Sequence, residues 1–201
     1  MIVTFFDTET TGLLEFKAPD HDKRQPHLVQ LALLMMDTVR KVPLKKVSVI
    51  VDVKIPIPAQ ATETHGITNE MSAKFGIQCK TAIHLFRHFA ERSDRMVAHN
   101  KNFDLRLLRV QGLREGVDWN FMTGKDVYCT MEGSRNLVKS PPTEKMIAAN
   151  MHGFKSPKLS ECYRHFYNEE LEGAHDALVD TEACARVYFT LLGLGVITEP
   201  G

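Results

Sequence analysis

Two acidic residues near the start of the chain have a spacing that suits metal binding. Asp7 and Glu9 directly follow the short apolar run 2–6, which is typical of a buried strand. Side chains at positions i and i+2 of a strand point to the same face, so both carboxylates can reach one cation. Hard ions such as Mg²⁺ and Mn²⁺ prefer oxygen ligands of this kind. The simpler interpretation of the pair is a solvated strand end.

Two further acidic positions stand at expected junctions between elements. Asp104 lies where an apolar strand-like run passes into a helix, a place where an aspartate can also serve as an N-cap. Asp180 falls in the first turn of the last predicted helix, which Asp176 can cap. His175 stands just outside that helix, and an imidazole ordinarily titrates near neutral pH. A helix cap and a surface histidine are the simpler interpretations. Phe103 is interpreted as a core residue.

The three groups together resemble the signatures of the DnaQ-like 3′→5′ exonucleases of the DEDDh type, in the RNase H-like superfamily. They occur in the family's order as FDTETTG at 6–12, HN followed by FD within 99–104, and HDALVD at 175–180. The resemblance covers the chain from Ile2 to about Leu192. Histidine rather than tyrosine, five residues before Asp180, is what assigns the chain to the DEDDh group.

The resemblance implies a two-metal hydrolysis of phosphodiester bonds, with two Mg²⁺ or Mn²⁺ ions per site. Asp7, Glu9 and Asp180 would hold the ion that binds the attacking water, and Asp7 would bridge to the second ion beside the leaving 3′ oxygen. Asp104 would complete the acidic cage, directly or through water. His175 would take the proton from the attacking water, a role that typically contributes ~10²–10⁴-fold in rate.

The resemblance also suggests which residues contact the substrate. Residues after the first motif meet the terminal nucleotide in the family, and His65 lies in a segment whose histidine packs against the terminal sugar and base. The simpler interpretation of His65 is a histidine at the start of a helix. Asn100 is expected to touch the substrate backbone. The full set of expected substrate contacts is Thr10, Thr11, Gly12, Leu13, His65 and Asn100.

The expected substrate is the 3′ end of nucleic acid, single-stranded DNA or a frayed DNA end first. Trimming of RNA 3′ ends by the same chemistry is the alternative, because discrimination depends on how the pocket treats a 2′ hydroxyl. A binding subunit without catalytic activity is a third possibility, disfavoured because all five site residues are present. The motifs leave association with a polymerase, or with itself, open.

Hydrophobic periodicity predicts the elements that must carry these residues. Strands are expected at 2–6, 28–37, 47–57, 95–99 and 125–129, with Pro56 and Pro58 ending the third. Helices are expected at 68–75, 80–92, from 104 onward, 159–167 and 177–194. Residues 16–26 are read as a surface loop. Strands first, then alternating helices and strands, predict an α/β fold: an RNase H-like mixed five-stranded sheet flanked by helices.

Length and composition are those of an ordinary globular domain, so residues 1–201 are interpreted as a single exonuclease domain. Lys and Arg balance Asp and Glu, which argues against broad binding to long duplexes through charge alone. The four cysteines form no CxxC pair, which disfavours a zinc or disulfide framework. No run is long and apolar enough to span a bilayer, and no signal peptide is visible. A cytoplasmic location and no membrane partner are therefore expected.

Residues 133–158 are the least patterned stretch and are expected to form a long loop with some helix. The stretch contains Lys139, Lys145, Lys155 and Lys158. One interpretation is a solvated loop, and the other is a loop beside the active cleft that guides the phosphates of a strand. Met151 and Phe154 are interpreted as core residues, with base stacking as the alternative.

Overall fold

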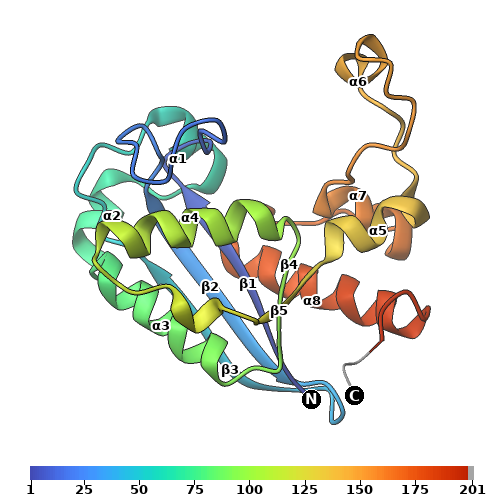
Figure 1. The fold of residues 1–201 in the computed structure, drawn as a ribbon, viewed down its shortest axis with the longest axis horizontal. Coiled ribbons are helices and arrows are strands. Elements are labelled where there is room, and N and C mark those ends of the chain that lie inside the picture. Colours follow the sequence, from blue (N-terminus) through green and yellow to red (C-terminus); the bar gives the residue numbers. More distant parts are fainter. Residues whose placement is uncertain (199–201) are drawn as a thin grey trace.

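The chain folds around one five-stranded mixed sheet (Figure 1). The computed structural model describes residues 1–198. The first three strands form an antiparallel meander, the fourth strand pairs with the first in parallel, and the fifth pairs with the fourth in parallel. The predicted α/β fold with an RNase H-like mixed sheet is confirmed. The strands are β1 (Ile2–Thr10), β2 (Leu28–Asp37), β3 (Val42–Ile50), β4 (Arg95–Ala98) and β5 (Asp126–Cys129), in the spatial order β3-β2-β1-β4-β5.

Helices cover both faces of this sheet. The helices α3 (Cys79–Glu91) and α4 (Lys101–Arg114) pack on one face, and α7 (Leu159–Tyr167) and α8 (Ala177–Gly193) pack on the other. None of the helices in the part of the chain described is long and apolar enough to cross a membrane. The remaining helices are α1 (Ala59–His65), α2 (Asn69–Phe75), a 3-10 turn (Asn120–Met122), α5 (Thr130–Val138) and α6 (Glu144–Ala148).

The strand β1 is central because its two faces bury different side chains. Phe5 packs edge-on against Tyr188 of α8, with ring centroids 5.3 Å apart. Phe6, on the opposite face, packs against Phe86 of α3 at the same centroid distance. Alternate residues of a strand point to opposite faces, so the row that begins with Val3 and Phe5 continues to Asp7 and then Glu9. The α8 side of β1 therefore ends in two carboxylates.

The parallel strands bring the sequence motifs to one edge of the sheet. The carboxyl ends of β1, β4 and β5 lie at the same edge, as the parallel pairing of these strands requires. Ligand sites of α/β sheets lie outside such carboxyl ends. We call this edge the carboxyl edge. It carries Asp7 and Glu9 on β1, His99 after β4, and the start of α5 after β5.

The third strand is the main point at which the prediction was wrong. β3 spans Val42–Ile50 rather than 47–57, and the two prolines expected to end it lie well beyond Ile50. An edge strand pairs on one side only, so its hydrophobic pattern in the sequence is weak. β3 is such a strand: it is largely exposed and carries Lys45 and Lys46, as edge strands commonly do. Pro58 instead occupies the N-cap position of α1, a helix that the periodicity did not predict.

Candidate active site

The carboxylates of β1 meet the first turn of α8. The row of β1 side chains that packs on α8 ends in Asp7 and Glu9, both half-buried, and Asp180 lies in the first turn of that helix. The Asp176 side chain caps α8 by accepting from the amides of Leu178 and Val179, at 2.9 and 3.3 Å. The helix start is thereby held where Asp180 faces the strand end.

His175 lies beside this acidic group. Ligand atoms of Glu9, His175 and Asp180 all lie within 4.8 Å of one another. The backbone of His175 has a φ of 72°, in the left-handed region, and its N–H donates to Asp180 Oδ2 at 3.0 Å. The histidine is exposed to solvent. An imidazole in this position can exchange a proton with a group bound at the carboxylates and with bulk water.

Asp104 approaches from the other side of β1. Its side chain is 3% exposed and accepts a 2.7 Å hydrogen bond from the hydroxyl of Thr8. The interpretation of Asp104 as an N-cap is wrong, because α4 begins at Lys101 and Asn100 takes the N-cap position. Asp104 is thus a buried acid within the first helical turn. Sequence reasoning missed Thr8, which points opposite to its neighbours Asp7 and Glu9 and holds this carboxylate.

Burial raises the pKa values of all four carboxylates, and repulsion from other members of the group adds to this for Asp7, Glu9 and Asp104. Burial, followed by Asp104, Asp180 and Glu9, raises the pKa of Asp7 well above its ordinary value. Burial and the same kind of repulsion raise the pKa of Glu9 to about 8. Burial raises the pKa of Asp104 to about 7 and also raises that of Asp180, although the backbone N–H of His175 opposes the latter. The group is therefore costly to ionise unless cations bind.

Lysine and arginine side chains do not compensate for this repulsion. Among residues 1–198, none of the four carboxylates forms an ion pair with Lys or Arg. Buried carboxylates are normally paired or coordinate a metal. Four oxygen-donor side chains without a paired cation make a donor set suited to hard divalent ions.

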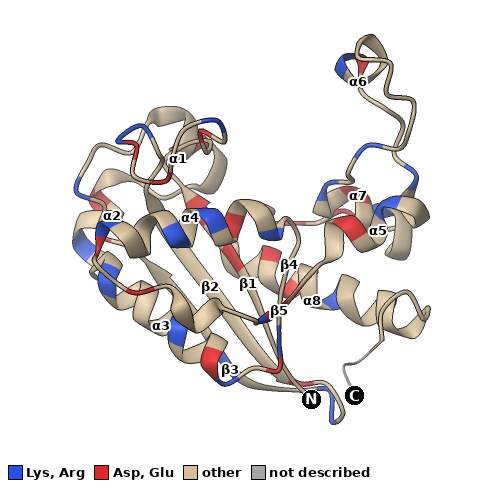
Figure 2. Ribbon diagram, in the orientation of Figure 1, with Lys and Arg blue, Asp and Glu red and all other residues tan. Residues whose placement is uncertain are grey.

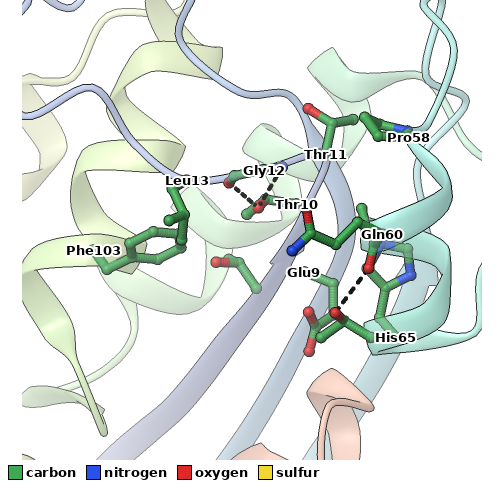
Figure 3. A pocket seen from close by; sticks show the side chains of 12 residues that line it. Glu9, Thr10, Thr11, Gly12, Leu13, Pro58, Gln60, His65 and Phe103 are labelled. Carbon is green, nitrogen blue, oxygen red and sulfur yellow. Dashed lines mark hydrogen bonds between the residues drawn. The ribbon is translucent and has the colours of Figure 1, made fainter.

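A pocket of about 460 Å³ adjoins the acidic group (Figure 3). Five of the six expected substrate contacts line it, since Asn100 is not among the lining residues. His65 ends α1 rather than starting a helix, so the simpler interpretation made from the sequence is wrong. Figure 3 shows Leu13 beside Phe103, with Glu9 and His65 on the opposite side. The lining residues are Thr8, Glu9, Thr10, Thr11, Gly12, Leu13, Pro58, Gln60, Ala61, Thr64, His65 and Phe103.

Some lining residues were missed or only partly understood from the sequence. Gln60, Ala61 and Thr64 belong to α1, and the only local signal for that helix was Pro58 before it. Phe103 does contact the hydrophobic core, as expected, but it also forms part of the pocket wall. One aromatic side chain can therefore be both the edge of the core and a surface for a ligand.

The segment that supplies one wall of the pocket is held on α4. Asp20 accepts from Arg106 Nε at 3.0 Å and from Arg109 Nε at 2.7 Å. The buried side chain of Gln25 bonds to the backbone of Glu15 in both directions, at 3.2 and 3.0 Å. These contacts keep the loop after β1 compact. Leu13 is 86% exposed at its start, so its side chain is available to a ligand.

Acidic side chains converge at the carboxyl edge of an RNase H-like sheet beside an imidazole and a pocket, and these features define a nuclease-type α/β protein. A sequence model of the exonuclease family, RNase_T, matches residues 4–188. The chain belongs to this exonuclease family, which confirms the family expected from the three motifs.

Similar proteins carry related names. A "DNA polymerase III subunit epsilon-like protein" of Rhodobacter capsulatus is 35% identical over 189 residues, which are 93% of this chain and 23% of that protein. Exonuclease I superposes with a TM-score of 0.72 at 16% identity, over 96% of this chain and 41% of that one. Exonuclease X, in complex with 5′ overhanging duplex DNA, gives 0.58 at 20% identity, over 98% and 94% of the two chains. At these identities the structural matches establish the fold, and this chain spans under a quarter of the Rhodobacter protein.

Proposed function

We propose that this chain is a 3′→5′ exonuclease that hydrolyses phosphodiester bonds at DNA 3′ ends with two divalent ions, Mg²⁺ or Mn²⁺. The observation that carries the proposal is the convergence of four carboxylates without a paired cation, next to an exposed imidazole and a pocket. Asp7, Glu9, Asp104 and Asp180 are the proposed metal ligands, and His175 is the proposed proton acceptor. Residues 1–201 are proposed to act as one exonuclease domain.

The donor set fits two divalent ions better than one. Repulsion among the carboxylates and burial both raise their pKa values, and a total charge of about +4 would offset four ionised carboxylates. The carboxylates of Asp104, Asp180 and Glu9 all lie close enough to Asp7 to raise its pKa. This proximity to all three supports a bridging role for Asp7. A zinc-bound form of exonuclease I from E. coli has been solved with single-stranded DNA, which supports divalent metal use in this fold.

The residues of the chain divide the work of hydrolysis. Bound divalent ions supply an activated water and neutralise charge on the attacking and leaving oxygens. Glu9 and Asp180 would hold the ion that binds the attacking water. The hydroxyl of Thr8 holds Asp104 in place through a 2.7 Å hydrogen bond. His175 accepts the proton that the attacking water loses. Because the His175 side chain is exposed, it can pass that proton to solvent before the next cycle.

The pocket is proposed to hold the 3′-terminal nucleotide. Its walls combine apolar surfaces from Leu13, Ala61 and Phe103 with a few polar groups, the usual make-up of a small-ligand site. The Nδ1 atom of His65 accepts from the amide of Ile67 at 3.1 Å, so Nε2 carries the proton. That Nε2 atom is buried, and the backbone of Thr10 beside the ring favours its protonated form. The His65 ring is therefore held against the end of β1, at the wall of the pocket.

The comparisons support nucleic acid, and DNA first, as the substrate. E. coli exonuclease I has been solved in complex with a dT13 oligonucleotide and with a dA16 oligonucleotide. The name of the Rhodobacter relative favours DNA over RNA and a setting close to a polymerase. A cytoplasmic location remains a prediction from the sequence.

Digestion of end-labelled oligomers tests the proposal. DNA and RNA of the same sequence, labelled at either end, are incubated with Mg²⁺ or Mn²⁺ and resolved on a gel. We expect 5′-labelled DNA to give a ladder of shortened products and 3′-labelled DNA to release labelled mononucleotide at once. EDTA should stop the reaction, excess Mg²⁺ should restore it, and Asp7→Ala should be inactive. Release of mononucleotide from the 5′ end, or no digestion of either polymer, would contradict the proposal, and a preference for RNA would overturn the choice of DNA.

A further inference from the structure

Residues 139–158 form an arm that projects from the body of the protein. Figure 1 shows this segment leaving α5, carrying α6 at its tip and returning to α7. The arm is closed near its base, where the Lys155 amide donates to the Ser140 carbonyl at 3.1 Å and the Lys155 ammonium pairs with Glu161 at 2.6 Å. Within residues 1–198, every recorded hydrogen bond of residues 142–154 joins two members of that segment. The tip is therefore held only by its own turns.

The base of the arm is attached to the segment that carries Asp104. The ring of His99 is buried and lies 3.0 Å from the carbonyl of Pro157 through Nε2, and 3.0 Å from the hydroxyl of Thr130 through Nδ1. A carbonyl only accepts, so Nε2 carries the proton and Nδ1 accepts from Thr130. His99 directly follows β4 at the carboxyl edge, and Asn100 then takes the N-cap position of α4. The arm thus rises from the same edge of the sheet as the acidic group.

The arm and the end of α5 that precedes it concentrate positive charge in a chain whose formal net charge is zero. Residues 133–158 contain five basic residues and one acidic residue, Glu144. Figure 2 shows the basic residues spread along the stem and tip. Among the described residues, only Lys155 of these five has an acidic ion-pair partner. The remaining four are Arg135, Lys139, Lys145 and Lys158, all exposed.

The tip also exposes large apolar side chains. Ile147, Met151 and Phe154 are 51%, 57% and 42% exposed. The interpretation of Met151 and Phe154 as core residues is wrong, because no other part of the described chain folds over the arm. An aromatic side chain among unpaired cations is the combination with which proteins bind single strands, through base stacking and phosphate contacts.

The arm stands on the side of the acidic group away from the pocket (Figure 1). The pocket proposed for the terminal nucleotide lies between the end of β1 and α1. In Figure 1, α1 and the arm stand on opposite sides of the start of α8, where Asp180 lies. Because α1 forms one wall of the pocket, a strand with its last nucleotide there and its scissile phosphate at the carboxylates can leave on the side away from α1. That is the side of the arm.

We propose that the arm binds the phosphate backbone and bases of the single strand that leads into the active site. The proposal rests on the proposed function, and it adds a second binding region upstream of the 3′ end. The exposed lysines contact phosphates, and Phe154 stacks on a base. Phosphodiester chemistry is common to DNA and RNA, so both are included in the test as dT20 and rU20.

The test compares matched variants of the full chain. Lys139→Gln/Lys145→Gln/Lys158→Gln removes the arm's free lysine charges, and Lys41→Gln/Lys74→Gln/Lys80→Gln removes the same charge from exposed lysines elsewhere. Phe154→Ala is matched by Phe75→Ala, since Phe75 is 61% exposed on α2. All these side chains are exposed, and unchanged melting temperatures verify folding. Binding of fluorescent dT20 and rU20 is measured by anisotropy without metal, so the readout does not depend on catalysis.

The arm lysine variant should bind dT20 more weakly at low salt. The slope of log Kd against log[salt] should be smaller by about 2 in this variant, because each of three lost phosphate contacts contributes about 0.7 to the slope. Phe154→Ala should raise Kd roughly 5- to 150-fold. Both control variants should bind like the parent protein. The p-nitrophenyl ester of thymidine 5′-monophosphate is too short to reach the arm, so its hydrolysis with Mg²⁺ reports the active site alone.

Different failures have different signatures. Equal weakening by both lysine variants, or unchanged dT20 and rU20 binding in the arm variants, would overturn the proposal. Unchanged oligonucleotide binding with an altered molecular mass in solution would make the arm a protein contact instead. The parent protein could fail to hydrolyse both the ester and the oligomers while its binding of dT20 still depends on the arm. That result would contradict the nuclease function and leave the arm proposal standing.

Discussion

Replacing Asp104 with asparagine should stabilise the metal-free protein while destroying its activity. Asp104 is 3% exposed, and burial together with Asp180 raises its pKa from an ordinary 3.8 to about 7. The folded protein therefore holds this proton more tightly than the unfolded chain. As pH rises from about 4 to 7, the unfolded chain loses the proton first, so the ionisation of Asp104 lowers the stability of the folded state.

The magnitude follows from the size of the shift. Three pKa units correspond to about 4 kcal/mol, and the neighbouring acids share part of the repulsion, so a range of about 2–4 kcal/mol is expected. For a chain of this length, 1 kcal/mol changes the melting temperature by about 2–4 °C. Asparagine keeps an oxygen that can accept from the Thr8 hydroxyl, so the 2.7 Å hydrogen bond can persist. Asp104→Asn should raise the melting temperature in EDTA at pH 8 by about 5–15 °C.

The assay is thermal unfolding followed by circular dichroism, in EDTA at pH 4 and pH 8 and then with Mn²⁺ at pH 8. The gain from Asp104→Asn should nearly vanish at pH 4, where the aspartate is protonated in the folded state. Mn²⁺ should stabilise the parent protein more than the variant, because the ion stabilises the carboxylate. Glu63→Gln, an exposed neutralisation on α1, serves as the control and should change little. A lower melting temperature for Asp104→Asn at pH 8 in EDTA, or an equal gain at both pH values, would refute the reasoning.

Four further changes have defined outcomes. His175→Ala should slow hydrolysis by ~10²–10⁴-fold while Mn²⁺ binding by calorimetry is kept; equal loss of metal here and in Asp7→Ala would contradict the proposed roles. Burial lowers the pKa of His99 to about 4 from 6.5, so about 3 kcal/mol of stability should be lost as pH falls from about 6.5 to 4. Denaturant titrations should show this loss as a change in the difference in unfolding free energy between the parent protein and His99→Asn, because the opposite contribution of Asp104 is common to both proteins. Gly76→Ala should unfold at lower denaturant, because a Cβ there would lie 2.3 Å from the Ser72 carbonyl oxygen; an unchanged midpoint would mean that the backbone can shift. Leu13→Ala should leave the melting temperature unchanged and raise KM for oligonucleotides, since Leu13 is 86% exposed beside the pocket.

The sequence alone was sufficient to predict the central strand and the helices that cover it. The buried run of β1, the apolar strand β2 and the periodic faces of α3 and α7 are local patterns, and local patterns are what periodicity detects. The three motifs also indicated the family and the five residues of the candidate site. Residue types that perform chemistry can be recognised without coordinates when their order along the chain is distinctive.

The tertiary structure decided what depends on partners distant in sequence. β3 was displaced in the prediction because its register comes from pairing with β2, and α1 was missed because it is supported by contacts of Ile57 and Ile67 with Val29. The exposure of Phe154 likewise depended on whether another segment covered it. The meeting of Glu9 with Asp180 follows from α8 packing on one face of β1, because a strand presents alternate residues to that face and a helix start can then meet the last of them.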